Sequence, residues 1–413
     1  MRADDRGRGA APVSRRVLLH VGTPKTGTSF VQDILFTHGE TLRERGILYA
    51  ADRPDAHFLA ALDLMQLPWG GLEREAAGTW EALAAQVRDW PDVAIVSHEI
   101  LGTASRVQAE QAMADLTTPG TELHLVVSAR DLVRQVPAEW QENVKHRRSK
   151  TYGDFLAELR DPARTSEVAQ WFWGVQEVPD VLARWGTTLP PERVHVVTVP
   201  RPGAAPTLLW ERFAGLFGID PEELTPSARA NASLGVPESA MLRRLNERLN
   251  DVLPNHHYRS LVREMVVHRN LAGRPGTTRL GLPPEVHAWA ADLAASWVEE
   301  LRARGYDVVG DLADLLPDEP RPFVDPDAPD EAAVADAALD ALTIMTAEAA
   351  KLRDVEVELH EVIQDLMGQI DALHATPGYR AKEKLVALSR RNPVARAGYA
   401  GYRRLRGSSS RST

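Results

Sequence analysis

The residues best suited to chemistry lie in a glycine- and threonine-rich segment near the N-terminus. The segment joins an apolar run (residues 17–21) to a stretch with helical spacing (residues 28–38), and it reads Gly22-Thr23-Pro24-Lys25-Thr26-Gly27-Thr28-Ser29. Where a strand passes through such a loop into a helix, successive backbone N–H groups and the helix dipole attract phosphate. Gly22 and Gly27 let the backbone turn tightly, the hydroxyls can donate, and Lys25 adds a compact positive charge. The segment therefore predicts a phosphate-binding loop.

The position of the lysine separates this loop from that of nucleoside triphosphatases. Gly22 and Gly27 have the spacing of the G-x-x-x-x-G-K-[ST] loop, but Thr28 stands where that loop requires lysine. The lysine lies earlier, at Lys25, and no strand ends in an aspartate clearly placed to hold Mg²⁺. The pattern disfavours ATP or GTP hydrolysis. The first alternative hypothesis is a small-molecule kinase built on this loop.

Two further groups of candidates follow other apolar runs. Arg130 ends the run 122–128, with Arg134 close behind it. A guanidinium at a strand end can hold phosphate through paired hydrogen bonds, and an ion pair with Asp131 is the structural alternative. His98 and Glu99 follow the run 92–97 and are candidate proton acceptors, because ligands of open α/β sheets bind at strand ends. A buried structural histidine is the alternative for His98.

Acceptor contacts are expected on the same side of the protein. His57 follows the first helix, although a histidine on an amphipathic helix face is the plainer interpretation. Trp69, beside Pro68 and two glycines, and the run 171–173 (Trp-Phe-Trp) lie in expected loops. Loop aromatics can stack on sugars or on planar acceptors, so a carbohydrate or another small molecule is the expected acceptor. The histidines form no metal-binding spacing, and no metal is expected.

Elements that position these residues can be read from the alternation of apolar runs and helical stretches. Four short apolar runs, at 17–21, 92–97, 122–128 and 193–199, are separated by stretches with helical spacing. Near-continuous apolar strands that alternate with helices indicate a parallel sheet covered on both faces. The predicted fold class is therefore α/β, a three-layer parallel sheet with helices on both faces, followed by a long C-terminal helix and a basic tail.

The chain divides into five expected regions. They are a disordered basic leader (1–16), a catalytic body (17–317), a Pro-rich acidic linker (318–330), an amphipathic helix (331–374) and a basic tail (375–413). The apolar residues of the helix drift relative to a heptad, so a zipper is not secured, but the helix offers a face for self-association. The leader lacks the long apolar region of an export signal, which favours a cytoplasmic protein.

Composition and charge exclude several classes of protein. With 44% hydrophobic and 26% charged residues, the chain is neither wholly disordered nor embedded in a membrane. Because there is no cysteine, disulfide scaffolds, thiolate metal sites and cysteine nucleophiles are excluded. The net charge of −10 hides a charge of +9 on residues 376–413. The tail suits an anionic partner, but no motif for sequence-specific nucleic-acid recognition accompanies it.

Taken together, the motifs resemble one known family. Pro24-Lys25-Thr26-Gly27-Thr28-Ser29 is similar to the 5′-phosphosulfate loop, P-K-x-G-T-[ST], of sulfotransferases that use 3′-phosphoadenosine-5′-phosphosulfate (PAPS). The resemblance spans roughly residues 17–316, and the Ala- and Arg-rich composition suggests a bacterial member. It implies a P-loop-like sulfotransferase fold and transfer of a sulfuryl group from PAPS to a hydroxyl or amine, without a metal.

The resemblance also implies roles for individual residues. Gly22 to Ser29 would cradle the 5′-phosphosulfate, Lys25 would assist the departing oxygen, and Arg130 would hold the 3′-phosphate. Glu99 is the preferred base, with His98 orienting the acceptor or replacing Glu99. The family's second 3′-phosphate ligand, a serine eight residues after the arginine, falls on Ala138. This departure leaves a degenerate, non-catalytic nucleotide-binding module as the second alternative.

Overall fold

A computed structural model describes residues 15–224, 233–392, 394 and 397–398. The chain forms two compact units, Met1–Asp340 and Ala341–Thr413. Most of the predicted leader (residues 1–14) and the end of the predicted basic tail (residues 399–413) lie outside the described residues.

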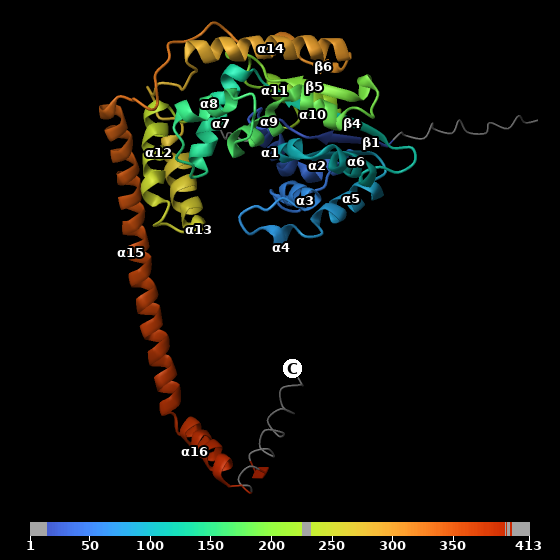
Figure 1. Cartoon of the computed structure of the whole chain (residues 1–413). Helices are drawn as coiled ribbons and strands as arrows, with labels where there is room; N and C mark the ends of the chain where they lie inside the picture. Colours follow the sequence, from blue (N-terminus) through green and yellow to red (C-terminus); the bar gives the residue numbers. More distant parts are fainter. Residues whose placement is uncertain (1–14, 225–232, 393, 395–396, 399–413) are drawn as a thin grey trace, which may run out of the picture. The chain divides into compact units, whose positions relative to one another are not determined.

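The core of the first unit is a six-stranded sheet in which every strand pair is parallel (Figure 1). In spatial order its strands are β2 (Ile47–Tyr49), β3 (Val93–Ser97), β1 (Arg16–His20), β4 (Glu122–Ala129), β5 (Val194–Thr198) and β6 (Asp307–Val309). The predicted α/β class is confirmed, and the four predicted strands form the centre of the sheet. The two edge strands, each three residues long, were not predicted because three residues carry too little periodicity.

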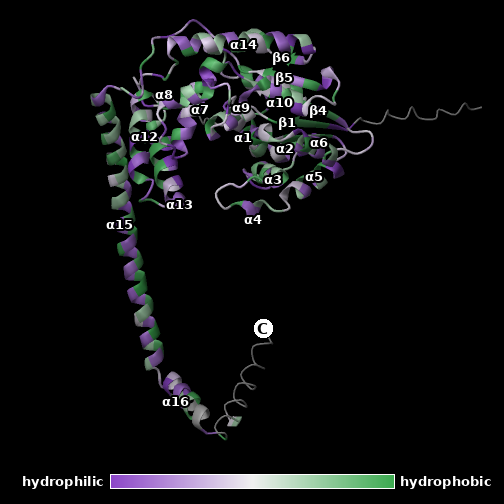
Figure 2. Ribbon diagram, viewed as in Figure 1, coloured by the Kyte–Doolittle hydropathy of each residue, from purple (hydrophilic) through white to green (hydrophobic). Residues whose placement is uncertain are grey.

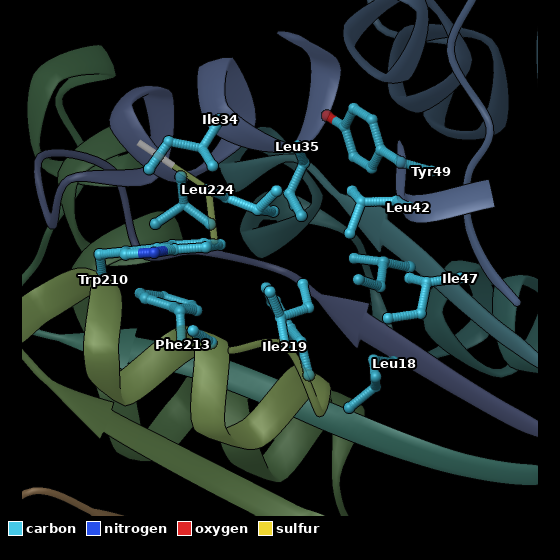
Figure 3. Close-up of a cluster of buried hydrophobic side chains, with 14 of the residues drawn as sticks. Leu18, Ile34, Leu35, Leu42, Ile47, Tyr49, Trp210, Phe213, Ile219 and Leu224 are labelled. Atoms are coloured by element: carbon cyan, nitrogen blue, oxygen red, sulfur yellow. The ribbon is translucent and has the colours of Figure 1, made fainter. Parts of the chain in front are cut away.

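One face of the sheet is covered by α1 (Thr28–Thr37), α2 (Gly39–Glu44) and α11 (Leu208–Phe217). Alternate residues of the central strands point to this face, where Trp210 and Phe213 of α11 meet Ile34 and Leu35 of α1 (Figure 3). The shared cluster fixes α1 against the sheet. The phosphate-binding candidates at the start of α1 are therefore held by packing as well as by the loop itself.

The opposite face is covered by a second set of helices. The helix α10 (Val178–Trp185) packs on β4 and on α6 (Arg106–Asp115). At its end, a Cβ on Gly186 would lie 3.5 Å from Leu125 of β4, which points away from the α1 face. Trp185 is fully buried, and its indole donates to the carbonyl of Leu101 at 3.2 Å. Helices therefore cover both faces of the sheet, as expected.

The remaining helices of the first unit surround these layers. Those that bear on the site are α3 (Ala56–Met65), α7 (Leu132–Lys145), α9 (Glu167–Gln176) and a π-helix (Tyr258–Leu271). The others are α4 (Glu73–Ala76), α5 (Thr79–Asp89), α8 (Tyr152–Arg160), α12 (Val236–Leu249), α13 (Asn255–His257) and α14 (Pro284–Arg304). Because β3, β1 and β4 are adjacent and parallel, the chain segments that follow them meet at one edge of the sheet, where ligands of such sheets bind.

The C-terminal region is helical. The helix α15 (Glu331–Ala375) covers the predicted range and begins within the first unit, and α16 (Pro377–Arg391) follows it. Between them the side chain of Thr376 caps α16 by accepting from the amide of Tyr379. Across the described residues, no helix combines the length and the apolar character that a membrane crossing requires.

Two buried histidines make the stability of the first unit sensitive to acid. His20 lies between the hydroxyls of Ser97 and Ser128, and His57 bonds the carbonyl of Ala50 and the amide of Ser97. Burial lowers the pKa of each histidine to about 4. An unfolded histidine has a pKa near 6.5. The stabilisation is therefore complete above about pH 6.5 and is lost as the pH falls towards 4.

We expect the free energy of unfolding to fall by about 2 kcal/mol for each of these histidines between pH 7 and pH 5. Urea unfolding at the two pH values measures the loss. The variant His57→Gln keeps a hydrogen-bonding side chain that does not titrate. Between pH 7 and pH 5 its free energy of unfolding should therefore fall by about 2 kcal/mol less than that of the wild type. A free energy of unfolding that stays constant from pH 7 to pH 5 would contradict the prediction.

Candidate functional site

The loop after β1 turns at two glycines whose backbone conformations exclude other residues. Gly22 has φ 117° and Gly27 has φ 87°, both in the region that favours glycine. A Cβ on Gly22 would lie 3.0 Å from the carbonyl oxygen of Glu99, and one on Gly27 would overlap a methyl group of Leu209. The glycines therefore let the loop lie close against both the segment after β3 and the helix α11.

Hydrogen bonds to β4 hold the loop in this shape. The amide of Thr23 donates to the carbonyl of Ser128 at 2.8 Å, and the Ser128 hydroxyl donates back to the carbonyl of Gly22 at 2.8 Å. The buried hydroxyl of Thr26 donates to the carbonyl of Thr23 at 2.6 Å and lies 2.6 Å from the Ser128 hydroxyl. These contacts fix the backbone before any ligand binds, which favours a preorganised site.

The loop presents a row of unpaired donors. Within the described part of the chain, no backbone carbonyl accepts from the amides of Lys25, Thr26, Gly27, Thr28 and Ser29. The helix α1 that begins here has no side-chain cap and no acidic residue in its first turn. Unpaired amides at an uncapped helix N-terminus form an anion-binding cradle. The loop therefore has the geometry of an anion cradle, and phosphate binding by it stays a prediction.

Arg130 lies beside this cradle at the end of β4. One guanidinium nitrogen, Nη1, donates to the carbonyl of Lys25 at 3.1 Å, while the buried Nε has no partner among the described residues. Burial lowers the pKa of Arg130 to about 10, and the nearby Arg134 adds to this effect. A partly buried guanidinium with an unpaired N–H group is costly unless an anion completes it.

The alternative ion pair between Arg130 and Asp131 does not form. Asp131 instead caps α7 by accepting from the amide of Arg134 at 2.9 Å, and it also pairs with the Arg134 guanidinium. Arg134 donates further to the carbonyl of Pro200 at 3.0 Å, and its buried Nη2 has no partner in the described structure. Arg134 is therefore held next to Arg130 and reinforces the positive charge there.

Glu99 and His98 lie together at the end of β3, as the sequence predicts. Glu99 accepts from the side-chain amide of Gln32 at 3.0 Å. Burial opposes its ionisation, but His98 and hydrogen bonds that include Gln32 and Thr28 hold the pKa of Glu99 below its usual value. His98 accepts from the amide of Ile100 through Nδ1 at 3.2 Å, so its neutral form carries the proton on Nε2. Burial lowers the pKa of His98, which favours that neutral form.

Aromatic rings extend from His98 towards the surface. Phe58 lies between His98 and Trp69, with ring centroids 5.2 Å and 5.7 Å away, and Trp69 lies 5.7 Å from Trp171. Trp69 and Trp171 are both partly exposed. His57 differs from these residues: it is buried, and both of its ring nitrogens are bonded to backbone groups. His57 is therefore a structural residue and is not part of the candidate acceptor face.

One face of α7 completes the site, and the sequence reasoning missed it. Gln135 donates to the carbonyl of Pro24 at 2.5 Å, and Glu142 lies 2.6 Å from Nζ of Lys25. Between them, Glu139 is buried against α9, and its burial raises its pKa, an effect that Lys25 opposes. These three polar residues recur at spacings of four and three, which places them on one helix face. That spacing was the available signal.

Glu142 is surrounded by basic side chains. Besides Lys25, it faces His146 at 3.1 Å, Arg263 of the π-helix at 3.7 Å and Lys145 at 3.8 Å. Although burial opposes ionisation, the hydrogen bond to His146 and the charges of Lys25 and Lys145 hold the pKa of Glu142 far below its usual value. Glu142 is therefore a carboxylate at neutral pH. Its ion pair with Lys25 competes with any anion in the cradle that would need the same lysine.

We expect Glu142→Gln to strengthen anion binding in the cradle and to lower the thermal stability of the protein without ligand. The sequence resemblance implies that the loop binds adenosine 3′,5′-bisphosphate (PAP). Because the change frees Lys25 from its partner, the affinity for PAP should then rise about tenfold. It also leaves Lys145 and Arg263 without their carboxylate, so the melting temperature without ligand should fall by a few degrees. Thermal shift assays with and without PAP measure both effects. A lower melting temperature with unchanged or weaker PAP binding would contradict the competition.

No metal centre accompanies these residues in the described ranges. There, no three His, Cys, Asp or Glu side chains gather closely enough to hold an ion. To an anion, the site offers the charged side chains above and the unpaired backbone N–H donors of the loop.

Comparisons with known proteins add little to this picture. No protein-family model and no curated protein matches the chain. Among solved structures, the crystal structure of a sulfotransferase from Alicyclobacillus acidocaldarius is 17% identical, with a TM-score of 0.37. The match covers 63% of this chain and 98% of that one. A similarity of this size assigns no function, which must be argued from the site itself.

Proposed function

We propose that this protein transfers the sulfuryl group of PAPS to a hydroxyl or amine of a carbohydrate or small-molecule acceptor. One observation carries the proposal: among the described residues, the buried Nε of Arg130 has no partner and lies beside a row of unpaired amides. The site thus offers two adjacent binding positions for anionic groups, one at the loop amides and one at the Arg130 guanidinium. Lys25 lies in the loop between them. A nucleotide that carries phosphate at both its 3′ and 5′ positions matches such a pair of places.

The bound nucleotide would use both places. The loop from Gly22 to Ser29, which includes Thr23 and Pro24, would enclose the 5′-phosphosulfate. The amides of Lys25 to Ser29 would donate hydrogen bonds to this group. Arg130 would hold the 3′-phosphate, with Arg134 beside it. Ala138, in the slot where the sulfotransferase motif has serine, offers no hydrogen bond, so the arginines must supply more of the 3′-phosphate affinity.

In the proposed reaction, the acceptor oxygen forms a bond to sulfur as the bond from sulfur to the 5′-phosphate oxygen breaks. Negative charge develops on that departing oxygen and leaves with PAP. A lysine placed at this oxygen stabilises the transition state more than the ground state. For Lys25 to act there, its ammonium group must leave Glu142, from which it is 2.6 Å away in the free protein.

The acceptor's proton would pass to Glu99. One observation favours Glu99 over His98: Nδ1 of neutral His98 already accepts from the amide of Ile100, so its ring has no free acceptor nitrogen, whereas Glu99 is a carboxylate. The Nε2–H group of His98 can then donate to the acceptor oxygen and orient it. The rings of Phe58, Trp69 and Trp171 extend from this point, which suits a sugar or a planar acceptor.

Two other functions compete with this proposal. A small-molecule kinase would bind ATP–Mg²⁺, but Thr28 stands where that loop needs lysine, and its hydroxyl bonds Glu99. A non-catalytic nucleotide-binding module would bind PAP without turnover, and Ala138 is the feature that favours it.

Calorimetric titration with PAP and with ATP–Mg²⁺ distinguishes these functions. We expect micromolar affinity for PAP and far weaker binding of ATP–Mg²⁺. A preference for ATP–Mg²⁺ would reject the proposal in favour of a kinase. Radiolabelled PAPS offered with a broad panel of phenols, sugars and amines then tests turnover. Tight PAP binding without sulfated product on any acceptor would favour the binding module.

A further inference from the structure

The long helix α15 carries a band of exposed apolar side chains that the proposed function does not use. Between residues 341 and 375, its large apolar residues include eleven that are 48–61% exposed. Figure 2 shows green, apolar segments recurring along this helix between hydrophilic ones. An apolar band of this kind on a helix is unfavourable in water unless another surface covers it.

The band contains an unbroken seven-residue repeat. Starting at Met345, every seventh residue is large and apolar, and the series is Met345, Leu352, Leu359, Leu366 and Leu373. A second series lies three residues ahead of the first: Leu342, Ala349, Glu356, Ile363 and Ile370. With the first series as heptad positions d, the second occupies positions a, which is the pattern of a coiled-coil seam. We call these two series the seam.

The remaining exposed apolar residues explain why the pattern drifts when it is read from the sequence. Val355 and Val362 occupy positions g, and Met367 occupies position e, so all three border the seam and widen it. Val357, at position b, is the exception that lies off this face. Gly368 lies at position f, opposite the seam, where an added Cβ would meet nothing within 4 Å. The seven-residue spacing therefore runs from Leu342 to Leu373 without a shift. The apolar residues beside the seam make the spacing hard to recognise in the sequence.

We propose that the seam binds the same seam of a second copy of this chain, as a parallel, in-register coiled coil. Leucine at most d positions, with isoleucine at two of the a positions, favours parallel two-stranded packing. The flanking charges agree, because Glu348 lies at g and Arg353 lies at the following e position. In a parallel pair, the g residue of one helix faces that e residue of the other, so opposite charges meet.

Glu356 is the one charged residue of the seam, and the structure gives it a partner. Its carboxylate accepts from Nη1 of Arg353 in the same helix at 2.6 Å. In the parallel pair, Arg353 would then lie between Glu356 of its own helix and Glu348 of the second copy. In the parallel pair the two Glu356 carboxylates would face each other, a repulsion that Arg353 of each helix offsets in part, so this position costs stability. The pairing of Glu348 with Arg353 favours two copies in register, beyond a general apolar attraction.

The mass of the full-length protein in solution tests the association. Sedimentation equilibrium should give twice the chain mass of 45.5 kDa for the wild type. Leu359→Asp should give the single-chain mass, whereas the matched control Val357→Asp adds the same charge two residues away, off the seam, and should remain dimeric. Unchanged thermal unfolding of the first unit shows that each variant is folded. A monomeric wild type, or a Leu359→Asp variant that stays dimeric, overturns the proposal.

Orientation is tested by single-cysteine crosslinking, for which the natural chain, without cysteine, is the ideal background. A parallel, in-register pair brings identical d positions face to face, within reach of a disulfide. Leu366→Cys in the full chain should therefore crosslink to near completion under mild oxidation, and Glu361→Cys, at position f on the far side, should not. Absence of the Leu366→Cys crosslink in a dimeric protein overturns the parallel register, and equal crosslinking of both variants overturns the assigned face.

Discussion

Replacing Arg130 with alanine should lower the affinity for PAP about 100-fold, because the 3′-phosphate loses a charge-assisted, bidentate partner. The expectation rests on the buried Nε of Arg130, which has no partner in the described structure, and on its position beside the loop. Calorimetric titration measures the change. Adenosine 5′-phosphate lacks the 3′-phosphate, so its affinity should be nearly the same for the wild type and the variant.

The comparison of the two nucleotides isolates the contact from any general damage. If Arg130→Ala weakens both nucleotides equally, the arginine supports the loop through its bond to the Lys25 carbonyl and does not contact the 3′-phosphate. Arg130→Lys keeps the charge but not the paired geometry, so it should recover only part of the affinity. Arg134→Ala should have a smaller effect than Arg130→Ala, because its guanidinium is held by Asp131 and Pro200.

Replacing Lys25 with alanine should reduce the rate of sulfuryl transfer by about 10²–10³-fold. Its charge is needed most as the 5′-phosphate oxygen departs, whereas the unpaired amides of the loop still bind the ground state. We therefore expect PAP affinity to fall much less than turnover. Release of PAP from PAPS, with a pool of phenols and sugars as acceptors, gives the rate, and calorimetry gives the affinity.

Lys145 provides a matched control for Lys25. It also lies near Glu142, at 3.8 Å, but it belongs to the end of α7 and not to the loop. Lys145→Ala should leave turnover within a few-fold of the wild type. Equal losses for the two variants would mean that the charge around Glu142 matters and that Lys25 has no particular role at the departing oxygen.

Several features of the site could be predicted from local sequence because their physical cause is local. The glycines of the loop, the apolar run before it and the helical spacing after it all lie within residues 17–38. Likewise, Arg130, His98 and Glu99 each follow an apolar run. Once the runs are taken as parallel strands, the common edge of the sheet brings the following residues together. The confirmed α/β architecture therefore places these candidates near one another.

Element boundaries were harder to predict where two signals compete. Proline suits the first turn of a helix, so Pro137 is a candidate start for the helix after Arg130 when only the sequence is considered. In the structure α7 begins at Leu132, because the side chain of Asp131 caps it, and Pro137 lies inside the helix. This shift of the helix start matters for the site, because it brings Gln135 into α7 and places it on the same face as Glu139 and Glu142.

By itself, the sequence determined the fold class, the candidate loop with its displaced lysine, and the charged residues at the strand ends, because each depends on residues close together in the chain. Tertiary structure alone decided that Glu142 holds Lys25, that His57 is buried and that, within the part of the chain that the structure describes, Arg130 retains an unpaired N–H group. Such facts depend on contacts between residues roughly 40 to more than 100 positions apart, and no local pattern encodes the distance between two side chains on different elements.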